Sequence, residues 1–167
     1  MKRNIQRCSE CGRRVEKGKI SFIDDRPVCL TCIYGEIKAL EIYPIGKVRN
    51  EPKRSKSNFG LTGPEGISRI ELIPSQECFM HKLEEEKFLT IVYYLHKTKS
   101  VKSIFKRGLD GKEVGAFASR TPYRLSRIGI QDVKLVKVEG TTLYVEGLDA
   151  INGSPVLDIK LKWSALN

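Results

Sequence analysis

Short apolar runs separated by turn-forming residues follow one another from Ile42 onward, and each run has the length of a β-strand. Leu89–Leu95 is a continuous run of apolar, β-branched and aromatic residues, which predicts a strand buried on both faces. Val156–Trp163 alternates between apolar and other residues and predicts a strand with one buried face. The residues of that face are Leu157, Ile159, Leu161 and Trp163.

The same kind of pattern predicts further strands around Ile70 and Leu72 and at Val114–Ala118, Val133–Val138 and Leu143–Gly147. Glu139-Gly140-Thr141 separates the last two and predicts a hairpin turn. Helical periodicity is scarce, because only Phe79, Met80 and Leu83 indicate one or two short turns. The pattern therefore predicts a mainly β protein, a small single-sheet β-barrel with few helices.

Four of the five cysteines form two Cys-x-x-Cys pairs, Cys8 with Cys11 and Cys29 with Cys32, separated by 17 residues. This spacing is typical of a structural zinc site, and Gly12 suits the tight turn that brings two thiolates to one metal. Because cysteine occupies all four positions, no coordination position is left for water, and we expect the zinc to be structural. A pair of disulfides or a redox-active Cys-x-x-Cys is the alternative.

The cysteine pairs lie in the first 40 residues, a segment that buries too little apolar surface to fold alone. Metal binding would supply the missing free energy of folding. The sequence therefore predicts two domains, a zinc-ribbon-like module at 1–40 and a β-barrel domain at 41–167. Cys78 stands apart and is expected to be an ordinary semi-buried thiol.

Basic residues outnumber acidic ones, with 30 Lys and Arg against 20 Asp and Glu and a formal net charge of +10. This balance favours a polyanionic partner, with nucleic acid ahead of a membrane surface. One basic block surrounds Lys53, Arg54 and Lys56, and a second extends from Lys102 to Arg127. A solvated loop explains the first block equally well. No apolar run is long enough to span a bilayer, so a membrane protein is not expected.

Four motifs between Tyr43 and the C-terminus are similar to those of one known family. They are Pro44–Arg49 (PIGKVR), Leu83-Glu84 with Val92–Lys97 (VYYLHK), Val114–Arg124 (VGAFASRTPYR) followed by Ile128-Gly129, and Gly147–Lys160 (GLDAINGSPVLDIK). On these motifs the chain resembles the TrmO family, also called YaeB or TsaA-like, over about three quarters of its length. The resemblance implies a single β-barrel and a tRNA methyltransferase that depends on S-adenosylmethionine.

The same resemblance implies methylation of the exocyclic amine of threonylcarbamoyladenosine, the modified base beside the anticodon of certain tRNAs. It also implies a homodimer with the cofactor near the subunit interface, and a cytoplasmic location. A zinc module is not standard in the family. Residues 1–40 are therefore expected to be an accessory module that strengthens the binding of tRNA.

The chain departs from the family motifs at several positions. Arg124–Gly129 (RLSRIG) stands where the family has RPNPIG, Phe88 replaces a histidine, and Asn152 replaces an acidic residue. These motifs are expected to shape the cofactor and base pockets, so two alternatives stay open. One is a catalytically altered adaptor on the same barrel that binds S-adenosylmethionine, tRNA or protein, and the other is methylation of a different substrate.

Methyl transfer to a poorly nucleophilic amine requires alignment of the reactants and an acceptor for the amine proton. Asp149 and Asp158 are the carboxylates in the matching motif and are the candidate catalytic residues. Asp158 has a second interpretation as a solvent-exposed partner of Lys160. His96 follows an apolar strand, and we interpret it as a hydrogen-bonding residue at the strand end.

The candidate cofactor-binding residues belong to the two longest motifs and their continuation, and they are Arg120, Thr121, Arg124, Ser126, Ile128, Asn152 and Lys160. The guanidinium groups of Arg120 and Arg124 match either the cofactor carboxylate or a tRNA phosphate, so phosphate steering is the alternative. The candidate nucleic-acid-binding residues are Lys53, Arg54, Lys102, Lys106, Arg107 and Arg127.

Overall fold

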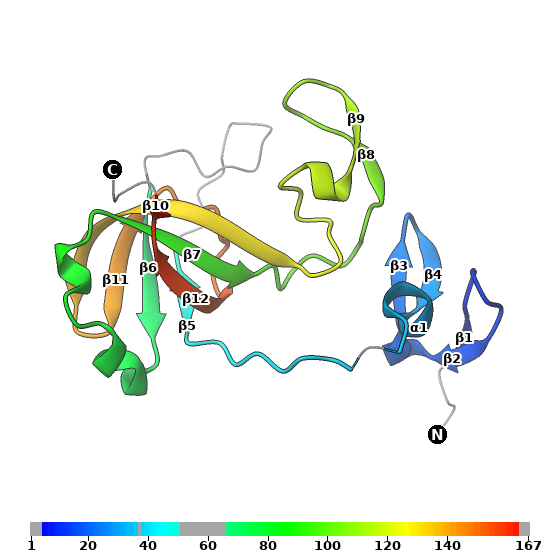
Figure 1. The fold of residues 1–167 in the computed structure, drawn as a ribbon, viewed down its shortest axis with the longest axis horizontal. Helices are drawn as coiled ribbons and strands as arrows, with labels where there is room; N and C mark the ends of the chain where they lie inside the picture. Colours follow the sequence, from blue (N-terminus) through cyan, green and yellow to red (C-terminus); the bar gives the residue numbers. More distant parts are fainter. Residues whose placement is uncertain (1–4, 37, 51–65, 164–167) are drawn as a thin grey trace. The chain divides into compact units, whose positions relative to one another are not determined.

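The computed structural model describes residues 5–36, 38–50 and 66–163 (Figure 1). Contacts between residues divide the chain into two compact units. The first unit joins Met1–Glu41 to Thr98–Ser126, and the second joins Ile42–Lys97 to Arg127–Asn167. The predicted boundary between residues 40 and 41 stays a prediction. No pattern in the sequence indicated that Thr98–Ser126 belongs with the N-terminal segment.

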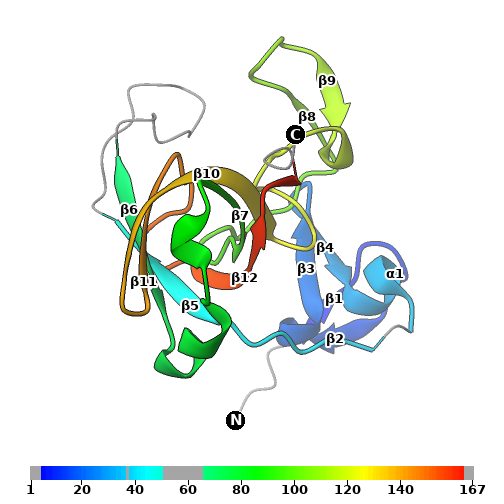
Figure 2. The ribbon, with the colours of Figure 1, turned by 60° about the vertical axis from the view of Figure 1, so that its left-hand side comes forward.

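The second unit is a closed barrel of antiparallel strands in the order β10–β11–β6–β5–β12–β7 (Figures 1 and 2). The strands are β5 Gly46–Arg49, β6 Ile67–Leu72, β7 Phe88–Tyr94, β10 Ile128–Glu139, β11 Thr142–Glu146 and β12 Pro155–Leu161. β10 is long enough to pair with β7 along its first half and with β11 along its second. The predicted mainly β fold with a small barrel is confirmed.

The barrel interior is filled from one face of each strand. In β7 the side chains of Leu89, Ile91 and Tyr93 are buried, and those between them are half-buried. They pack with buried side chains of the other strands, namely Val48, Ile70, Leu72, Val133, Leu135, Leu143, Val145 and Val156. The prediction that Leu89–Leu95 is buried on both faces is wrong, because a barrel strand has one inner and one outer face.

A β-bulge in β12 shifts the predicted alternation by one residue. Val156 and Asp158 pair with consecutive residues of β7, so Leu157 is the extra residue of the bulge. Val156 is fully buried before the bulge, and Ile159 packs against the core after it. The predicted buried face is therefore wrong for Leu157, for Leu161, which is 38% exposed, and for Trp163, which is 87% exposed.

The hairpin between β10 and β11 has the turn that the sequence predicts. Glu139 pairs with Thr142, so Gly140 and Thr141 form the connection. Gly140 has φ 55°, a left-handed conformation that a tight hairpin turn requires and that glycine adopts without strain. The predicted strand Val133–Val138 covers only the second half of β10, which begins at Ile128, and the predicted strand Leu143–Gly147 overlaps β11.

Two 3₁₀ helices, Pro74–Phe79 and Leu83–Glu85, stand where the weak helical pattern predicted short turns. Cys78 lies in the first of them and is exposed, and its thiol donates to the carbonyl oxygen of Ser75 at 3.7 Å. The prediction of a semi-buried thiol is wrong, because no residue of this 3₁₀ helix is buried.

The first unit is built from short hairpins and one short helix. Its elements are β1 Ile5–Arg7, β2 Arg14–Glu16, β3 Ile20–Ile23, β4 Arg26–Cys29, α1 Leu30–Tyr34, β8 Ile104–Lys106 and β9 Glu113–Gly115, with 3₁₀ helices at Lys17–Lys19 and Ala116–Ala118. β1 pairs with β2, β3 with β4, and β8 with β9. The predicted strand Val114–Ala118 ends at Gly115, because a 3₁₀ helix begins at the next residue.

Candidate functional site

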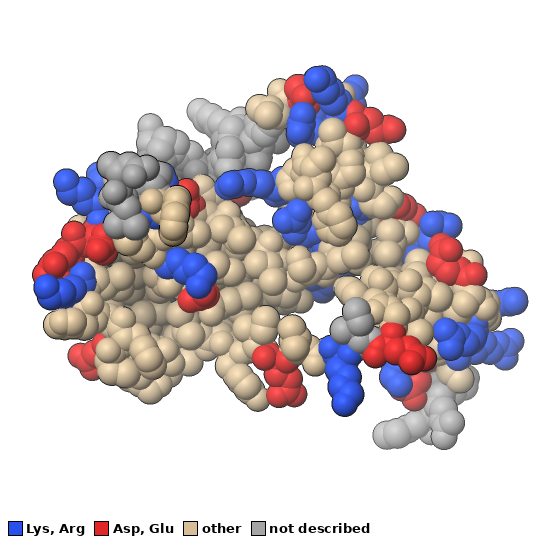
Figure 3. All heavy atoms as spheres, viewed as in Figure 1, with Lys and Arg blue, Asp and Glu red and all other residues tan. Residues whose placement is uncertain are grey.

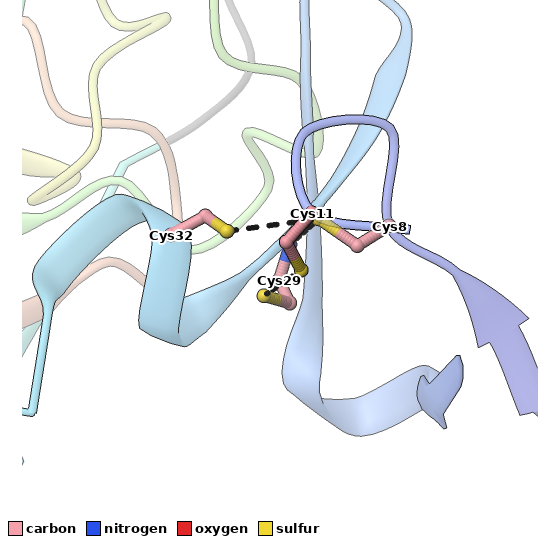
Figure 4. Close-up of side chains that lie close together, drawn as sticks. All are labelled: Cys8, Cys11, Cys29 and Cys32. Atoms are coloured by element: carbon pink, nitrogen blue, oxygen red, sulfur yellow. Dashed lines mark hydrogen bonds between the residues drawn. The ribbon is translucent and has the colours of Figure 1, made fainter. Parts of the chain in front are cut away.

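The side chains of the four paired cysteines converge from separate elements (Figure 4). Cys8 and Cys11 follow β1, Cys29 ends β4, and Cys32 lies in α1. Their sulfur atoms all lie within 4.8 Å of one another, and we call the four residues the cysteine centre. Cys8 Sγ lies 3.9 Å from Cys32 Sγ, and Cys11 Sγ lies 3.9 Å from Cys29 Sγ. Thiolates bound to zinc at about 2.3 Å in a tetrahedron are about 3.8 Å apart, so the arrangement fits zinc.

Hydrogen bonds to sulfur favour the thiolate form at part of the cysteine centre. Backbone N–H groups of Cys11 and Cys29 lower the pKa of the Cys8 thiol to about 6. The Arg13 guanidinium, with Nε at 3.4 Å from Cys11 Sγ, lowers the pKa of Cys11. The neighbouring sulfurs, Cys29 first, raise the pKa of Cys32 to about 12. A cation between the four sulfur atoms is therefore needed to keep all four cysteines in the thiolate form, and a metal ion would provide it.

None of the five cysteines forms a disulfide in this structure. The disulfide alternative therefore has no support in the structure. The close approach of four sulfur atoms from two Cys-x-x-Cys pairs also differs from a single redox-active pair.

The residues Ala116–Arg124, which we call the signature loop, are held together by their own side chains. Ser119 Oγ donates to the carbonyl oxygen of Ala116 at 3.0 Å and accepts from the Thr121 N–H at 3.3 Å. Arg124 Nη2 donates to the carbonyl oxygens of Ala116 at 3.2 Å and of Ser119 at 3.1 Å. Arg124 Nε is buried and has no hydrogen-bond partner among the residues that the structure describes. The Arg124 guanidinium is thus an internal brace of this loop.

The other predicted cofactor ligands of this region differ in exposure. Thr121 is 8% exposed, and its Oγ1 accepts the Tyr123 N–H at 3.3 Å. Arg120 and Ser126 are exposed, so their side chains can meet a ligand directly. Arg120 therefore offers the guanidinium fork that the sequence assigned to both arginines.

The predicted nucleic-acid-binding residues near the β8–β9 hairpin are not equivalent. Lys102 and Lys106 are exposed, and Lys102 Nζ lies 5.5 Å from the centre of the Tyr123 ring. Arg107 instead forms a two-point ion pair with Asp110, with Nη2–Oδ2 at 2.6 Å and Nε–Oδ1 at 3.0 Å. In Figure 3, acidic and basic side chains stand side by side around this hairpin. Lys102 and Lys106 are better placed than Arg107 to meet phosphate.

Three further predicted nucleic-acid-binding residues lie elsewhere. Lys53 and Arg54 lie outside the described residues. Arg127 belongs to the second unit, has φ 51°, and accepts the Leu95 N–H at 2.8 Å through its carbonyl oxygen. Its backbone therefore closes the pairing of β7 with β10.

In the second unit, Asn50 fixes the loop that follows β11 and carries Asp149 and Asn152. Asn50 Nδ2 donates to the carbonyl oxygen of Ala150 at 2.6 Å and to Ser68 Oγ at 3.3 Å. The Asn50 N–H donates to Asn152 Oδ1 at 3.3 Å. Asn152 is exposed, but its side chain is tied to the end of β5.

Asp149 is half-buried, and its neighbours in sequence, Leu148 and Ala150, belong to the barrel core. Burial, followed by the negative charge of Asp149, raises the pKa of Tyr93 to about 12. The Tyr93 phenol therefore stays protonated at neutral pH and packs against Gly129, where a Cβ atom would lie 2.5 Å from its ring. Nearby in the same unit, buried Ser154 places its Oγ 3.4 Å from His96 Nδ1. That contact agrees with a hydrogen-bonding role for His96.

Asp158 forms the ion pair that its second interpretation described. Its Oδ2 lies 2.6 Å from Lys160 Nζ, and its Oδ1 accepts the Ile159 N–H at 2.8 Å. The two side chains are 46% and 63% exposed, so this is a solvent-facing pair. Ile128, the remaining predicted cofactor ligand, is half-buried at the start of β10.

Asn50, Tyr93 and Asp24 are not among the functional candidates that the sequence predicts. A lone asparagine after a strand and a tyrosine within an apolar run have no periodic signal. Asp24 lies in Ile23-Asp24-Asp25-Arg26, where paired aspartates between two short strands would have indicated a hairpin turn.

A closed six-stranded barrel carrying a polar loop, combined with a four-cysteine centre, defines a small β-barrel protein with a candidate ligand loop and a candidate structural metal site. The profile of the tRNA-methyltransferase O N-terminal domain matches residues 49–165. The chain belongs to this family, and the resemblance predicted from its motifs is confirmed.

Two curated relatives illustrate the range of the family. The chain is 32% identical over 121 residues to a probable S-adenosyl-L-methionine-binding protein, VirR, of Rhizobium radiobacter, a match that covers 71% of this chain and 69% of the relative. It is 40% identical over 95 residues to the tRNA (adenine(37)-N6)-methyltransferase of Mus musculus, a match that covers 55% of this chain but only 22% of the mouse protein.

The fold is also similar to that of solved structures. The TrmO crystal structure from Pseudomonas aeruginosa aligns with a TM-score of 0.61 and 26% identity. The alignment covers 79% of this chain and 60% of the TrmO chain, so the protein spans about three fifths of that structure. Separately, none of the helices in the described part of the chain is long and apolar enough to cross a membrane.

Proposed function

We propose that the protein is a tRNA methyltransferase that uses S-adenosylmethionine to methylate the exocyclic amine of threonylcarbamoyladenosine beside the anticodon. The observation that carries this proposal is the family match over residues 49–165. The mouse relative, named as a tRNA (adenine(37)-N6)-methyltransferase, supports tRNA as the substrate. The specific modified base rests on the resemblance of the motifs alone.

S-adenosylmethionine supplies an already activated methyl group, so the protein needs mainly to bind, align and exclude water. In this proposal the exposed Arg120 binds the cofactor carboxylate, and Arg124 and Thr121 keep the loop in shape. Ser126, Ile128, Asn152 and Lys160 complete the proposed set of cofactor-binding residues.

Asp149 is the stronger candidate for accepting the amine proton. It is half-buried, and its charge already acts on the buried Tyr93 phenol. Asp158 remains a proposed catalytic residue, but Lys160 and the Ile159 N–H occupy one oxygen each. Because both oxygens of Asp158 already have partners, we rank it second.

The remaining parts of the proposal concern metal, partners and location. Zinc bound by the cysteine centre would serve as a structural metal, because four thiolates leave no position for water. Lys102 and Lys106 would contact tRNA phosphates, together with Lys53, Arg54, Arg107 and Arg127. A homodimer acting in the cytoplasm is proposed from the family resemblance.

A second candidate function is binding of S-adenosylmethionine without methyl transfer, as an adaptor. The observations that favour it are the altered Leu125-Ser126-Arg127 segment and Phe88 in place of a histidine. The name of the VirR relative, which mentions only S-adenosylmethionine binding, is compatible with it.

Calorimetry with S-adenosylmethionine and S-adenosylhomocysteine, followed by methyl transfer to tRNA with and without threonylcarbamoyladenosine, tests both candidates. Binding plus transfer only to the modified tRNA supports the methyltransferase. Binding without transfer to either tRNA supports the adaptor. If neither S-adenosylmethionine nor S-adenosylhomocysteine binds, both candidate functions are contradicted.

A further inference from the structure

The segment before β8 is hydrogen-bonded to the hairpin of β3 and β4 within the first unit. The Asp24 N–H donates to the carbonyl oxygen of Val101 at 3.0 Å, and the Val101 N–H donates to the carbonyl oxygen of Phe22 at 3.2 Å. Ile23 and Val101 form a parallel bridge, and Val101 is 6% exposed. The end of β3 therefore pairs with the segment around Val101, which lies almost eighty residues later in the sequence.

The Asp24 carboxylate adds a side-chain link to this backbone link. Its Oδ1 accepts the Ser103 N–H at 3.0 Å, and its Oδ2 accepts the Ser103 hydroxyl. These two donors lower the pKa of Asp24, so the carboxylate is charged at neutral pH. Asp24 and its neighbour Asp25 have φ 48° and 62°, which is the backbone of a two-residue hairpin turn.

Ser103 and its neighbour Lys102 in turn hold both ends of the signature loop. The carbonyl oxygen of Ser103 accepts the Ala116 N–H at 2.9 Å at the start of the loop. The Lys102 N–H donates to the carbonyl oxygen of Tyr123 at 3.0 Å near its end. A continuous series of hydrogen bonds thus runs from the tip of the β3–β4 hairpin to the loop that carries Arg120, Thr121 and Arg124.

We propose that Asp24 is a positioning residue for the signature loop, through which the N-terminal module sets the affinity of that loop for its ligand. The part that concerns ligand affinity rests on the proposed function, which assigns S-adenosylmethionine binding to this loop. Asp24 does not touch the ligand itself. It acts by fixing Ser103 and Lys102, to which the loop is bonded.

The test compares Asp24→Gly with Asp25→Gly in the full chain. Both substitutions remove one carboxylate from the same turn, and glycine accepts the left-handed backbone at both positions. Only Asp24 is bonded to Ser103. Zinc content, measured for each protein, shows whether the cysteine centre is preserved in both variants.

Hydrogen exchange should be about tenfold faster at the amides of Lys102, Ser103 and Ala116 in Asp24→Gly, because charge-assisted bonds are lost. S-adenosylmethionine should bind about five- to tenfold more weakly, with KM raised and kcat little changed. Asp25→Gly should stay within about twofold of the parent in all of these.

Unchanged exchange in Asp24→Gly would overturn the positioning role. Faster exchange with unchanged S-adenosylmethionine affinity would overturn the link to the ligand. A fall in kcat, together with an equal loss of stability in the two units, would show that Asp24→Gly destabilises the whole protein. That outcome would also count against the positioning role. A parent protein that binds no S-adenosylmethionine contradicts the proposed function, and the exchange rates alone then decide whether Asp24 positions the loop.

Discussion

The two arginines of the signature loop have different roles because they have different surroundings. Arg124 donates from its Nη2 group to two carbonyl oxygens of its own loop, whereas Arg120 is exposed. The sequence predicts the same role for both, since both match the same motif. Only the local fold shows which of them maintains the loop and which is available to a ligand.

Exchanging each arginine for alanine separates these roles. Arg124→Ala removes two charge-assisted hydrogen bonds, so the free energy of unfolding should fall by about 1.5–3 kcal/mol. Arg120→Ala should change stability by less than about 0.5 kcal/mol, as is usual for an exposed residue, yet weaken S-adenosylmethionine binding. Urea unfolding and calorimetry provide the two readouts. An Arg120→Ala protein with normal cofactor affinity and weaker tRNA binding would assign this arginine to phosphate instead.

The Arg49–Glu71 pair gives the barrel a pH-dependent contribution. Arg49 Nε lies 2.8 Å from Glu71 Oε2 and lowers the pKa of that carboxyl. Since the folded-state pKa is depressed, the stabilisation is present above the unfolded pKa of about 4.3 and is lost as pH falls through the folded value. Both side chains are more than one third exposed, so the effect is at most about 1 kcal/mol.

Glu71→Gln should therefore lower the free energy of unfolding by less than about 1 kcal/mol at pH 7, and the difference from the parent should shrink towards pH 3. Urea unfolding at both pH values measures it. A difference that grows on acidification would contradict the assigned sign.

At the scale of elements, the sequence predicts features that depend on neighbouring residues better than features that depend on contacts between distant segments. The β10–β11 hairpin was predictable because its turn and both strands lie in one continuous stretch around Gly140. The inner face of β12 was not, because the bulge at Leu157 depends on pairing with β7, more than sixty residues earlier. The cysteine centre was predictable in its members, since a metal imposes the spacing. The bonds of Asp24 to Ser103 have no comparable signal.

The pairing of Gly129 in β10 with Tyr93 in β7 allows a test of the packing of the barrel. Gly129→Ala should place its methyl group within 2.5 Å of the Tyr93 ring and destabilise the protein by about 1–3 kcal/mol, as overpacking does. Gly66→Ala is the matched control in the same unit, because no atom of the described residues lies within 4 Å of the position that its Cβ atom would take and its φ is not left-handed. Thermal unfolding of the two variants measures the difference. Equal melting temperatures would show that Tyr93 has room to move.

At the scale of the whole molecule, the two units differ in what holds them together. The barrel has a continuous apolar core from all six of its strands. The buried core of the N-terminal module contains Val28 and two of the cysteines, Cys8 and Cys29. A core this small needs a metal or another cross-link.

Removing zinc should therefore act on one unit. With a strong chelator, exchange at the amides of residues 5–36 and 98–126 should rise, while the barrel strands keep their protection. Elemental analysis before treatment should give about one zinc per chain. Hydrogen exchange followed by mass spectrometry reports both units in one experiment. Protein purified without metal, and with the same protection in both units, would contradict a structural zinc.

The pairing of Tyr94 with Ile128 has a consequence for the order of folding. The chain leaves the barrel after β7 and returns to it at β10, directly beside the point of departure, with Thr98–Ser126 in between. Once the barrel has formed, the two ends of this excursion are already close, so its loop-closure entropy no longer opposes folding. The excursion can therefore fold after the barrel. Because the closure entropy grows only slowly with loop length, the excursion can also gain or lose residues during evolution at a small cost to the barrel.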